Sequence, residues 1–195
     1  MNEQGSQIVA GLKTVREFHA SAAKLLQLAT AKMNEQGWTV PIRSAACGSR
    51  GSKALYNAAY WLPEDAFQFY RHETQPLVLA YIALIFDDAE DESRVTEPII
   101  TTGKITFAAE GKGANGEYHY PWCRTILSAE KAQRTSGQWT HQQPSEVVYG
   151  SYYQVESFEL LGSDLIAIQY ESSLVTAIVG PLLDRLASGG TNPVT

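Results

Sequence analysis

The chain has 195 residues and a net charge of −6, with 15 Lys and Arg against 21 Asp and Glu. This length suits one domain with a sizeable core, and a hydrophobic content of 44% is typical of a folded globular protein. The acidic balance disfavours a dedicated nucleic-acid binder, which needs a basic surface against the phosphate backbone. The charge is uneven, because residues 1–60 carry seven basic and three acidic side chains, whereas residues 61–117 carry four and eleven.

No signal peptide is predicted, since the N-terminus lacks a basic region followed by an apolar run, and no apolar stretch approaches about 18 residues. The two cysteines, Cys47 and Cys123, lack the C-x-x-C spacing. We therefore expect a soluble cytoplasmic protein with reduced thiols and no membrane association.

An amphipathic helix is predicted from Ser6 to Gln36, because apolar residues recur there every three or four positions. These residues are Ile8, Leu12, Val15, Phe18, Ala22, Leu25, Ala29 and Met33. Ser6 is expected to cap the start of the helix, and Gly37 to end it in a left-handed conformation. A helix of about 30 residues extends roughly 45 Å, enough to cross a whole sheet or to pair with a second copy of itself.

Three runs rich in β-branched and aromatic residues predict strands over 66–71, 77–86 and 98–107. Before them, Pro41 confines a short extended run to a sheet edge or a loop. Residues 53–62 are ambiguous between strand and helix, and we interpret them as the first arm of a hairpin with 66–71.

The rest of the chain predicts a minor helix, one more strand and a closing helix. Pro121 can begin a helix over about 121–133, and residues 135–145 are expected to be a polar loop. A strand is predicted over 147–161 with a bend at Gly150, and Ser163 followed by Asp164 is expected to begin a C-terminal helix that Gly180–Pro181 can interrupt.

The predicted fold class is α+β, because the strands cluster instead of alternating with helices. We expect a mainly antiparallel sheet of about five strands, covered by the long N-terminal helix and the C-terminal helix. A single domain over 1–195 would comprise the long helix (1–37), the sheet with the minor helix (38–161), the C-terminal helix (162–188) and a tail (189–195).

A basic glycine loop is the first candidate site. Gly48 and Gly51 would let backbone N–H groups approach a phosphate, while Arg50 and Lys53 add positive charge. The loop lacks the glycine-to-lysine spacing of a P-loop, so a flexible basic loop is the alternative interpretation.

Cys123 is the second candidate, as a nucleophile in the first turn of the helix that begins at Pro121. His119 lies four residues earlier and could act as its base. The alternative is a buried structural cysteine among Tyr118, Tyr120 and Trp122.

An acidic run could supply oxygen ligands to a divalent cation, but it lacks the alternation of an EF-hand loop, and a solvated hairpin tip is favoured. The run consists of Asp87, Asp88, Glu90, Asp91 and Glu92. A metal-dependent nuclease using Asp87 or Asp88 with Lys104 is disfavoured, since Thr102 occupies the position where an acidic residue is usual. The four histidines lack metal-ligand spacing, so the sequence predicts no metal site and no cofactor.

The leading hypothesis is a cytoplasmic, non-catalytic protein-interaction module that contacts another protein or a second copy of itself. The absence of a catalytic motif, the long amphipathic helix and the acidic segment favour it. The alternative is an enzyme or binding protein for a phosphorylated small molecule or nucleotide, using the loop 48–53. A nucleic-acid-associated subunit would require a set of basic residues on one face: Lys13, Arg16, Lys24, Lys32, Arg43, Arg50 and Lys53.

Overall fold

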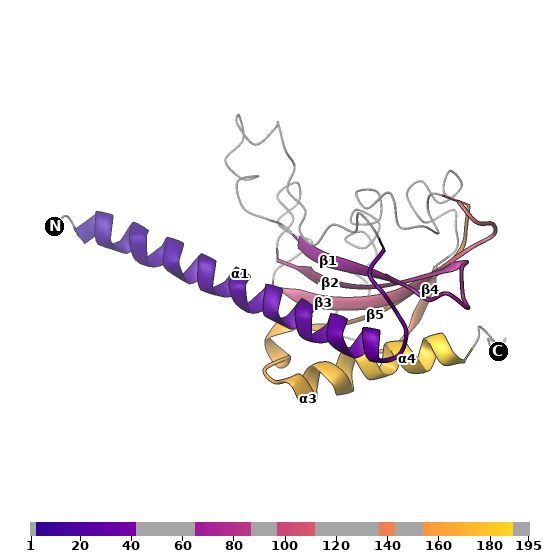
Figure 1. Cartoon of the computed structure of the whole chain (residues 1–195). Coiled ribbons are helices and arrows are strands. Elements are labelled where there is room, and N and C mark those ends of the chain that lie inside the picture. The colour runs from indigo at the N-terminus through magenta and orange to yellow at the C-terminus, as the bar shows by residue number, and fades with distance from the viewer. Residues whose placement is uncertain (1–2, 42–64, 87–96, 112–136, 143–153, 189–195) are drawn as a thin grey trace.

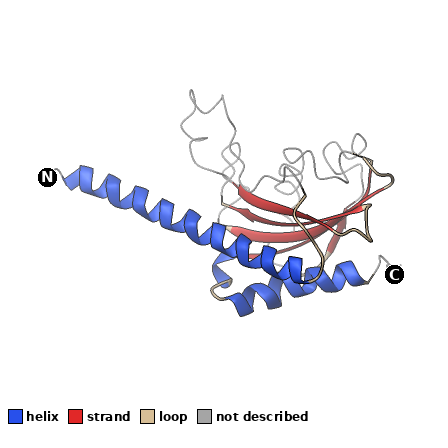
Figure 2. Cartoon of the chain, in the orientation of Figure 1, coloured by secondary structure: helices blue, strands red, loops and turns tan. Residues whose placement is uncertain are grey.

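A computed structural model describes residues 3–41, 65–86, 97–111, 137–142 and 154–188. Five strands form one antiparallel sheet in the order β1-β2-β3-β5-β4, which confirms the predicted α+β class. The elements are α1 (Glu3–Glu35), β1 (Asp65–Arg71), β2 (Val78–Ile85), β3 (Ile99–Phe107), β4 (Thr140–Gln142), β5 (Val155–Asp164), η4 (Leu165–Ala167), α3 (Glu171–Leu174), η5 (Val175–Val179) and α4 (Gly180–Ala187). Helix α1 and the C-terminal helices lie on the same side of the sheet (Figures 1 and 2).

The sheet is buried on both faces. Side chains alternate along each strand, so neighbouring residues contribute to opposite faces. The face under the helices, called here the helix-covered face, includes Ala66, Tyr70, Ala80, Ile82, Leu84 and Ile100. The buried cluster on the second face consists of strand residues in the described part of the chain, among them Phe67, Phe69, Leu79, Tyr81, Phe107 and Phe158. Burial on both faces explains why β2, which lies inside the sheet, is a continuous apolar run.

Helix α1 begins at Glu3, so Ser6 lies inside the helix and the predicted N-cap is wrong. Its C-terminal end follows the prediction, because Gly37 has a φ of 80°. The N–H of Trp38 donates to the carbonyl of Met33 at 3.0 Å, which is the hydrogen bond of a Schellman motif. This turn buries Trp38 and brings the chain to the sheet edge, where Thr39 pairs with Arg71.

Strand β5 is longer at its C-terminal end than the sequence predicts. Ser163 pairs with Ile100 and Asp164 with Ile99, so these residues extend the sheet and do not begin a helix. The short 3-10 turn η4 follows, and the C-terminal helix starts only at Glu171. The hydrogen bonds available from β3 outweigh the local capping preference of Ser163 and Asp164.

The C-terminal helix passes through Gly180–Pro181 without ending. Proline lacks an N–H and its ring crowds the preceding turn, so an ordinary helix kinks or breaks there. The preceding residues form the π-helical stretch η5, in which the N–H of Gly180 donates to the carbonyl of Val175. A β-carbon on Gly180 would lie 2.9 Å from that carbonyl oxygen, so glycine lets the helix continue into α4.

Strand β4 corrects the polar loop predicted over 135–145, because Thr140–Gln142 pair with β5 at the edge of the sheet. Polar side chains are compatible with a short edge strand, which is exposed along one side. Several predictions lie outside the described residues: the hairpin arm at 53–62, the helix at 121–133, the bend at Gly150 and most of the acidic connection.

The pairing of Tyr81 with Gly103 organises the second face of the sheet. The Tyr81 ring stacks on Phe158 with the ring centroids 5.9 Å apart, and its hydroxyl shares a hydrogen bond of 3.1 Å with Thr101. A β-carbon on Gly103 would collide with the Tyr81 ring and with the backbone carbonyl of Glu159. Glycine at this position therefore lets the aromatic ring lie close to β3.

We predict that Gly103→Ala lowers the free energy of unfolding by about 1–3 kcal/mol, the usual cost of overpacking a core, because the backbone of β5 cannot move aside. Urea unfolding followed by circular dichroism measures this loss. Gly111→Ala is the matched control, since nothing lies within 4 Å of a β-carbon there. Equal stability of the two variants would contradict this account of the strand pairing.

A polar contact also joins α1 to the sheet. Thr30 and Tyr70 share a hydrogen bond of 3.1 Å between their hydroxyl oxygens, beneath the helix. Burial raises the pKa of Tyr70 from 10.0 to about 12, so the folded state favours the neutral phenol. The contribution of the neutral Tyr70 side chain to the free energy of unfolding is complete below pH 10 and is lost as the pH rises toward 12.

We predict that Tyr70→Phe is less stable than the wild type at pH 7 by about 1 kcal/mol, because one buried hydrogen bond is lost. Between pH 10 and pH 12 the difference in the free energy of unfolding between the two proteins narrows. Only the wild type loses stability there, because its buried phenol resists ionisation while the phenol of the unfolded chain ionises. Thr30→Val, the control, removes the same hydrogen bond but keeps the alkaline loss. Urea titrations across this pH range test the prediction, and parallel curves for Tyr70→Phe and the wild type would contradict it.

Candidate functional site

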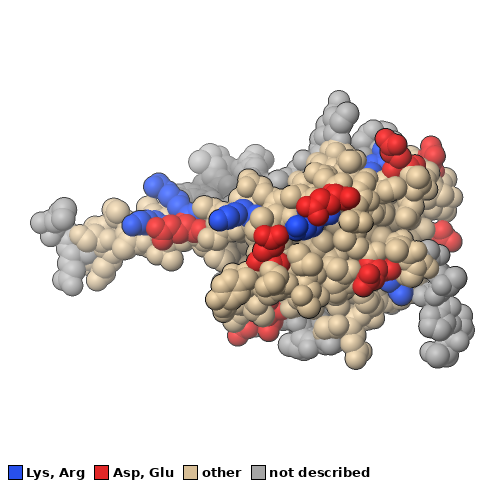
Figure 3. Space-filling view, turned by 60° about the horizontal axis from the view of Figure 1, so that its bottom comes forward, with Lys and Arg blue, Asp and Glu red and all other residues tan. Residues whose placement is uncertain are grey.

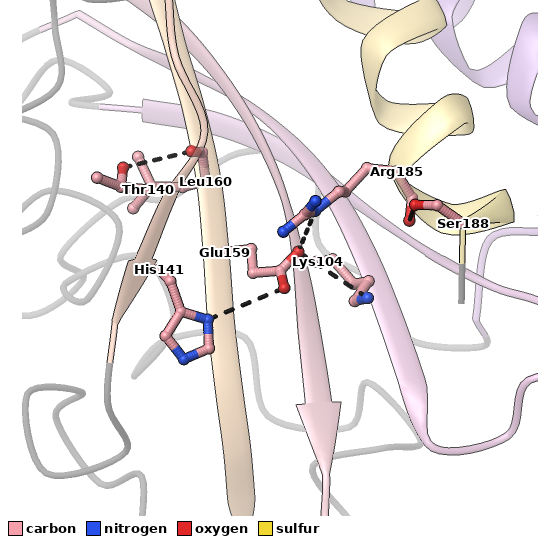
Figure 4. Close-up of polar contacts among 7 residues, drawn as sticks. All are labelled: Lys104, Thr140, His141, Glu159, Leu160, Arg185 and Ser188. Atoms are coloured by element: carbon pink, nitrogen blue, oxygen red, sulfur yellow. Dashed lines mark hydrogen bonds and ion pairs between the residues drawn. The ribbon is translucent and has the colours of Figure 1, made fainter. Parts of the chain in front are cut away.

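Four ionisable side chains meet on the helix-covered face (Figure 4). The strand register makes Glu159 the neighbour of Lys104 on one side and of His141 on the other. These three residues therefore form one row across β3, β5 and β4. Arg185 reaches the row from α4, which packs against this face.

The carboxylate of Glu159 is the centre of this charge cluster. Arg185 Nε donates to Glu159 Oε2 at 2.7 Å, and Lys104 Nζ lies 3.9 Å from the same oxygen. His141 Nδ1 lies 3.9 Å from Oε1, a contact that becomes an ion pair when the imidazole is protonated. Glu159 and Lys104 are only 3% and 5% exposed. The Arg185 side chain is 26% exposed, and its guanidinium carbon lies 5.8 Å from the centroid of the Trp139 ring.

The charged groups of the cluster contact one another; Glu159 and Lys104 are buried, whereas Arg185 and His141 are partly accessible to solvent. Burying a carboxylate or an ammonium group is costly unless an opposite charge compensates it. The bond from Arg185 to Glu159 provides this compensation and connects α4 to the middle of the sheet. We therefore interpret the cluster as structural.

A second feature, the apolar stripe of α1, has the character of a binding surface. The positions 8, 12, 15, 19, 22, 26, 29 and 33 are separated alternately by four and three residues, which is a heptad spacing, and all of them except His19 are apolar. The last four are buried against the helix-covered face: Ala22, Leu26, Ala29 and Met33. The buried line of the helix therefore contains Leu26, whereas the sequence prediction placed Leu25 there.

The beginning of the same stripe is exposed. Ile8 is 64% exposed, Val9 66% and Leu12 51%, while Val15 is partly buried. We call Ile8, Leu12 and Val15, together with the flanking Val9, the projecting stripe. Single exposed apolar residues are ordinary on protein surfaces, but a contiguous apolar line marks an interaction site more often.

Helix α1 makes its last described aromatic contact with the sheet at the end of β2. Phe18 and His19 both meet the ring of Phe86, at centroid distances of 5.0 and 5.4 Å. Before this contact the helix extends away from the sheet (Figure 1). Residues 3–17 span about 22 Å at the rise of an α-helix, so the projecting segment is about four turns long.

The basic residues of α1 are interleaved with carboxylates (Figure 3). Lys13 lies 3.7 Å from Glu17, and Lys32 lies 3.3 Å from Glu171 and 3.4 Å from Glu35. These carboxylates raise the pKa of Lys32, chiefly through the hydrogen bond with Glu171. An unbroken basic face, which a nucleic-acid-associated subunit would need, is therefore not present along α1.

The candidate residues from the sequence lie outside the described residues. This applies to the glycine loop with Gly48, Arg50, Gly51 and Lys53, and to Cys123 with His119, so their predicted roles stay predictions. Thr102 and Lys104 are described: Thr102 Oγ1 donates to the carbonyl of Tyr81 at 2.8 Å, and the carboxylate next to Lys104 is Glu159. Within the described ranges, no group of three or more His, Cys, Asp or Glu side chains could hold a metal ion.

The sequence contained a signal for the charge cluster that the prediction did not use. Lys104 is the charged residue of the predicted strand 98–107, and Glu159 stands between Phe158 and Leu160. A charge on the inward side of such a strand requires a partner. Which residue is that partner depends on the pairing between distant strands, and residue spacing alone does not reveal this pairing.

Comparison of the chain with protein-family models, with curated proteins and with solved structures found no match. None of the helices in the described ranges combines the length and apolar content that a membrane span needs.

We predict that Glu159→Gln lowers the free energy of unfolding by about 3 kcal/mol, because it leaves the buried Lys104 and the half-buried Arg185 without their shared counter-charge. Glu156→Gln, an exposed change on the same strand, should stay within about 0.5 kcal/mol of the wild type. Urea unfolding at pH 7 compares the two. Similar stabilities would show that the cluster does not secure α4.

Proposed function

We propose that this chain is a non-catalytic protein-interaction module of the cytoplasm, and that the projecting half of α1 is its contact surface. The carrying observation is that one heptad stripe is buried against the sheet in the second half of α1 and is exposed at Ile8 and Leu12 in the first half. The same side-chain pattern that packs on this protein's own core is thus presented to a partner.

The mode of binding that fits this surface is helix packing. An amphipathic helix binds through apolar residues spaced by three and four positions, and Ile8, Leu12 and Val15 have this spacing. Val9 and Phe18 flank this line and widen the apolar surface. A partner with an apolar groove or a matching helix would remove these side chains from water.

A non-catalytic role is supported by the charge cluster, in which the carboxylate of Glu159 is buried and is compensated by Lys104 and Arg185. An acid or base acting on a substrate has to reach the reacting atom. The alternative function, binding of a phosphorylated small molecule at Gly48–Lys53, depends on residues outside the described part of the chain.

We predict that a photo-crosslinking amino acid at position 12 forms a covalent adduct with a protein partner in cells that express this chain. The same group at position 10 should form at least tenfold less adduct, since Ala10 is exposed on the opposite side of the helix. Gel electrophoresis and mass spectrometry of the irradiated protein measure both yields. Equal yields at the two positions, or none at either, would count against the projecting stripe as the contact surface.

A further inference from the structure

We infer that the partner of the projecting stripe is a second copy of this chain, bound antiparallel through residues 3–17 of α1. This inference rests on the proposed function and names its partner. It follows from where the rest of the molecule lies relative to the stripe, from the length of the projecting segment and from its charge.

The direction of the partner helix follows from the position of the sheet. The buried half of the stripe faces the sheet and the C-terminal helices, which occupy the space beside residues 22–33. A second helix laid parallel along the stripe would carry its own sheet into that space. An antiparallel helix instead brings its sheet to the far end of the pair. A straight helix turns a heptad stripe by about 20° per heptad, so the projecting part stays broadly on the same side.

The register follows from the available length. The contact between the two projecting segments has to stop before Phe86, where Phe18 and His19 contact the sheet. Full overlap of residues 3–17 places Ile8 of one copy opposite Leu12 of the other. Because the two copies are related by a two-fold axis near Ala10, this contact occurs twice. In the same register Val15 lies opposite Gly5.

The residues near the two-fold axis suit close packing of two helices. Val9 of one copy lies beside Val9 of the other, and Gly11 lies beside Gly11. No atom lies within 4 Å of a β-carbon built on Gly5 or on Gly11, so both glycines face open space in the single chain. The absence of side chains at these positions lets the second helix approach closely.

The charge of the segment favours a like partner over a strongly charged one. Residues 3–17 contain two acidic and two basic residues, and Lys13 is already paired with Glu17. A neutral segment gains little from the field of an anionic membrane or of a nucleic acid. An identical apolar stripe, in contrast, is complementary to it in both length and polarity.

The expected affinity is modest. Four layers of side chains on helices about 22 Å long bury less than the roughly 1,600 Å² of a standard protein interface. We therefore expect a dimer that dissociates on dilution. The apparent mass should fall from twice 21.4 kDa toward 21.4 kDa as the concentration decreases from about 1 mM to about 1 μM.

Light scattering coupled to size-exclusion chromatography, applied to the full chain and to paired variants, tests both dimerisation and register. Ile8→Glu and Leu12→Lys should each weaken dimerisation at least tenfold, because every copy places a charge in the apolar contact. Mixing the two variants should restore it, since the heterodimer has one Glu–Lys layer and one intact Leu–Ile layer. Ala10→Glu, on the opposite side of the helix, should dimerise like the wild type. Circular dichroism checks that each variant remains folded.

Several outcomes overturn the inference. These are a monomer at every concentration, a dimer that tolerates Ile8→Glu and Leu12→Lys, and a mixture that stays monomeric while each single variant is folded. A monomer that sediments with anionic phospholipid vesicles through the stripe also overturns it. If the chain is monomeric but position 12 still crosslinks to a different protein, the inference fails and the proposed function stands. If position 12 crosslinks to nothing, both fail.

Discussion

The arrangement of the molecule depends on one contact, the packing of the second half of α1 on the sheet. Ala22 and Ala29 are small, so the helix approaches the strands closely, while Leu26 and Met33 fill the space between them. The hydrogen bond from Thr30 to Tyr70 lies within the same contact. Because an α-helix is stiff over this length, anchoring one half fixes the direction of the other. The position of the exposed apolar residues is thus a consequence of the core.

The charge cluster adds specificity to the same face. Apolar residues of similar volume could stabilise the contact between α4 and β5 as well as an ion pair does. Apolar packing, however, tolerates small shifts of a helix along a sheet, whereas Arg185 reaches Glu159 in one position only. With α4 in any other position, the buried charges of Lys104 and Glu159 would be less well compensated. We therefore regard the cluster as the feature that sets the position of α4, with the apolar residues supplying most of the stabilising free energy.

The sequence was sufficient for features that depend on local pattern. The runs that became β1, β2 and β3 and the stripe of α1 were predictable because periodicity and residue type act over a few positions. Features that depend on distant partners were missed. Strand β4 forms because β5 offers it an edge to pair with, and β5 extends to Asp164 because β3 offers pairing partners as far as Ile99. The charge cluster likewise required the register between distant strands. Heptad spacing was visible, but which half of the helix the core would cover was decided by tertiary packing.

Anchoring also explains how a short segment can serve as a binding surface. An isolated helix of about 15 residues is marginally stable in water, because forming its first turn is unfavourable. In this chain the buried half of α1 supplies that first turn, and residues 3–17 extend a helix that already exists. A partner then has little backbone entropy left to remove, which lowers the cost of binding. Contact through a few apolar layers can therefore yield measurable association, whereas the same residues in an unstructured tail would have to fold and bind together.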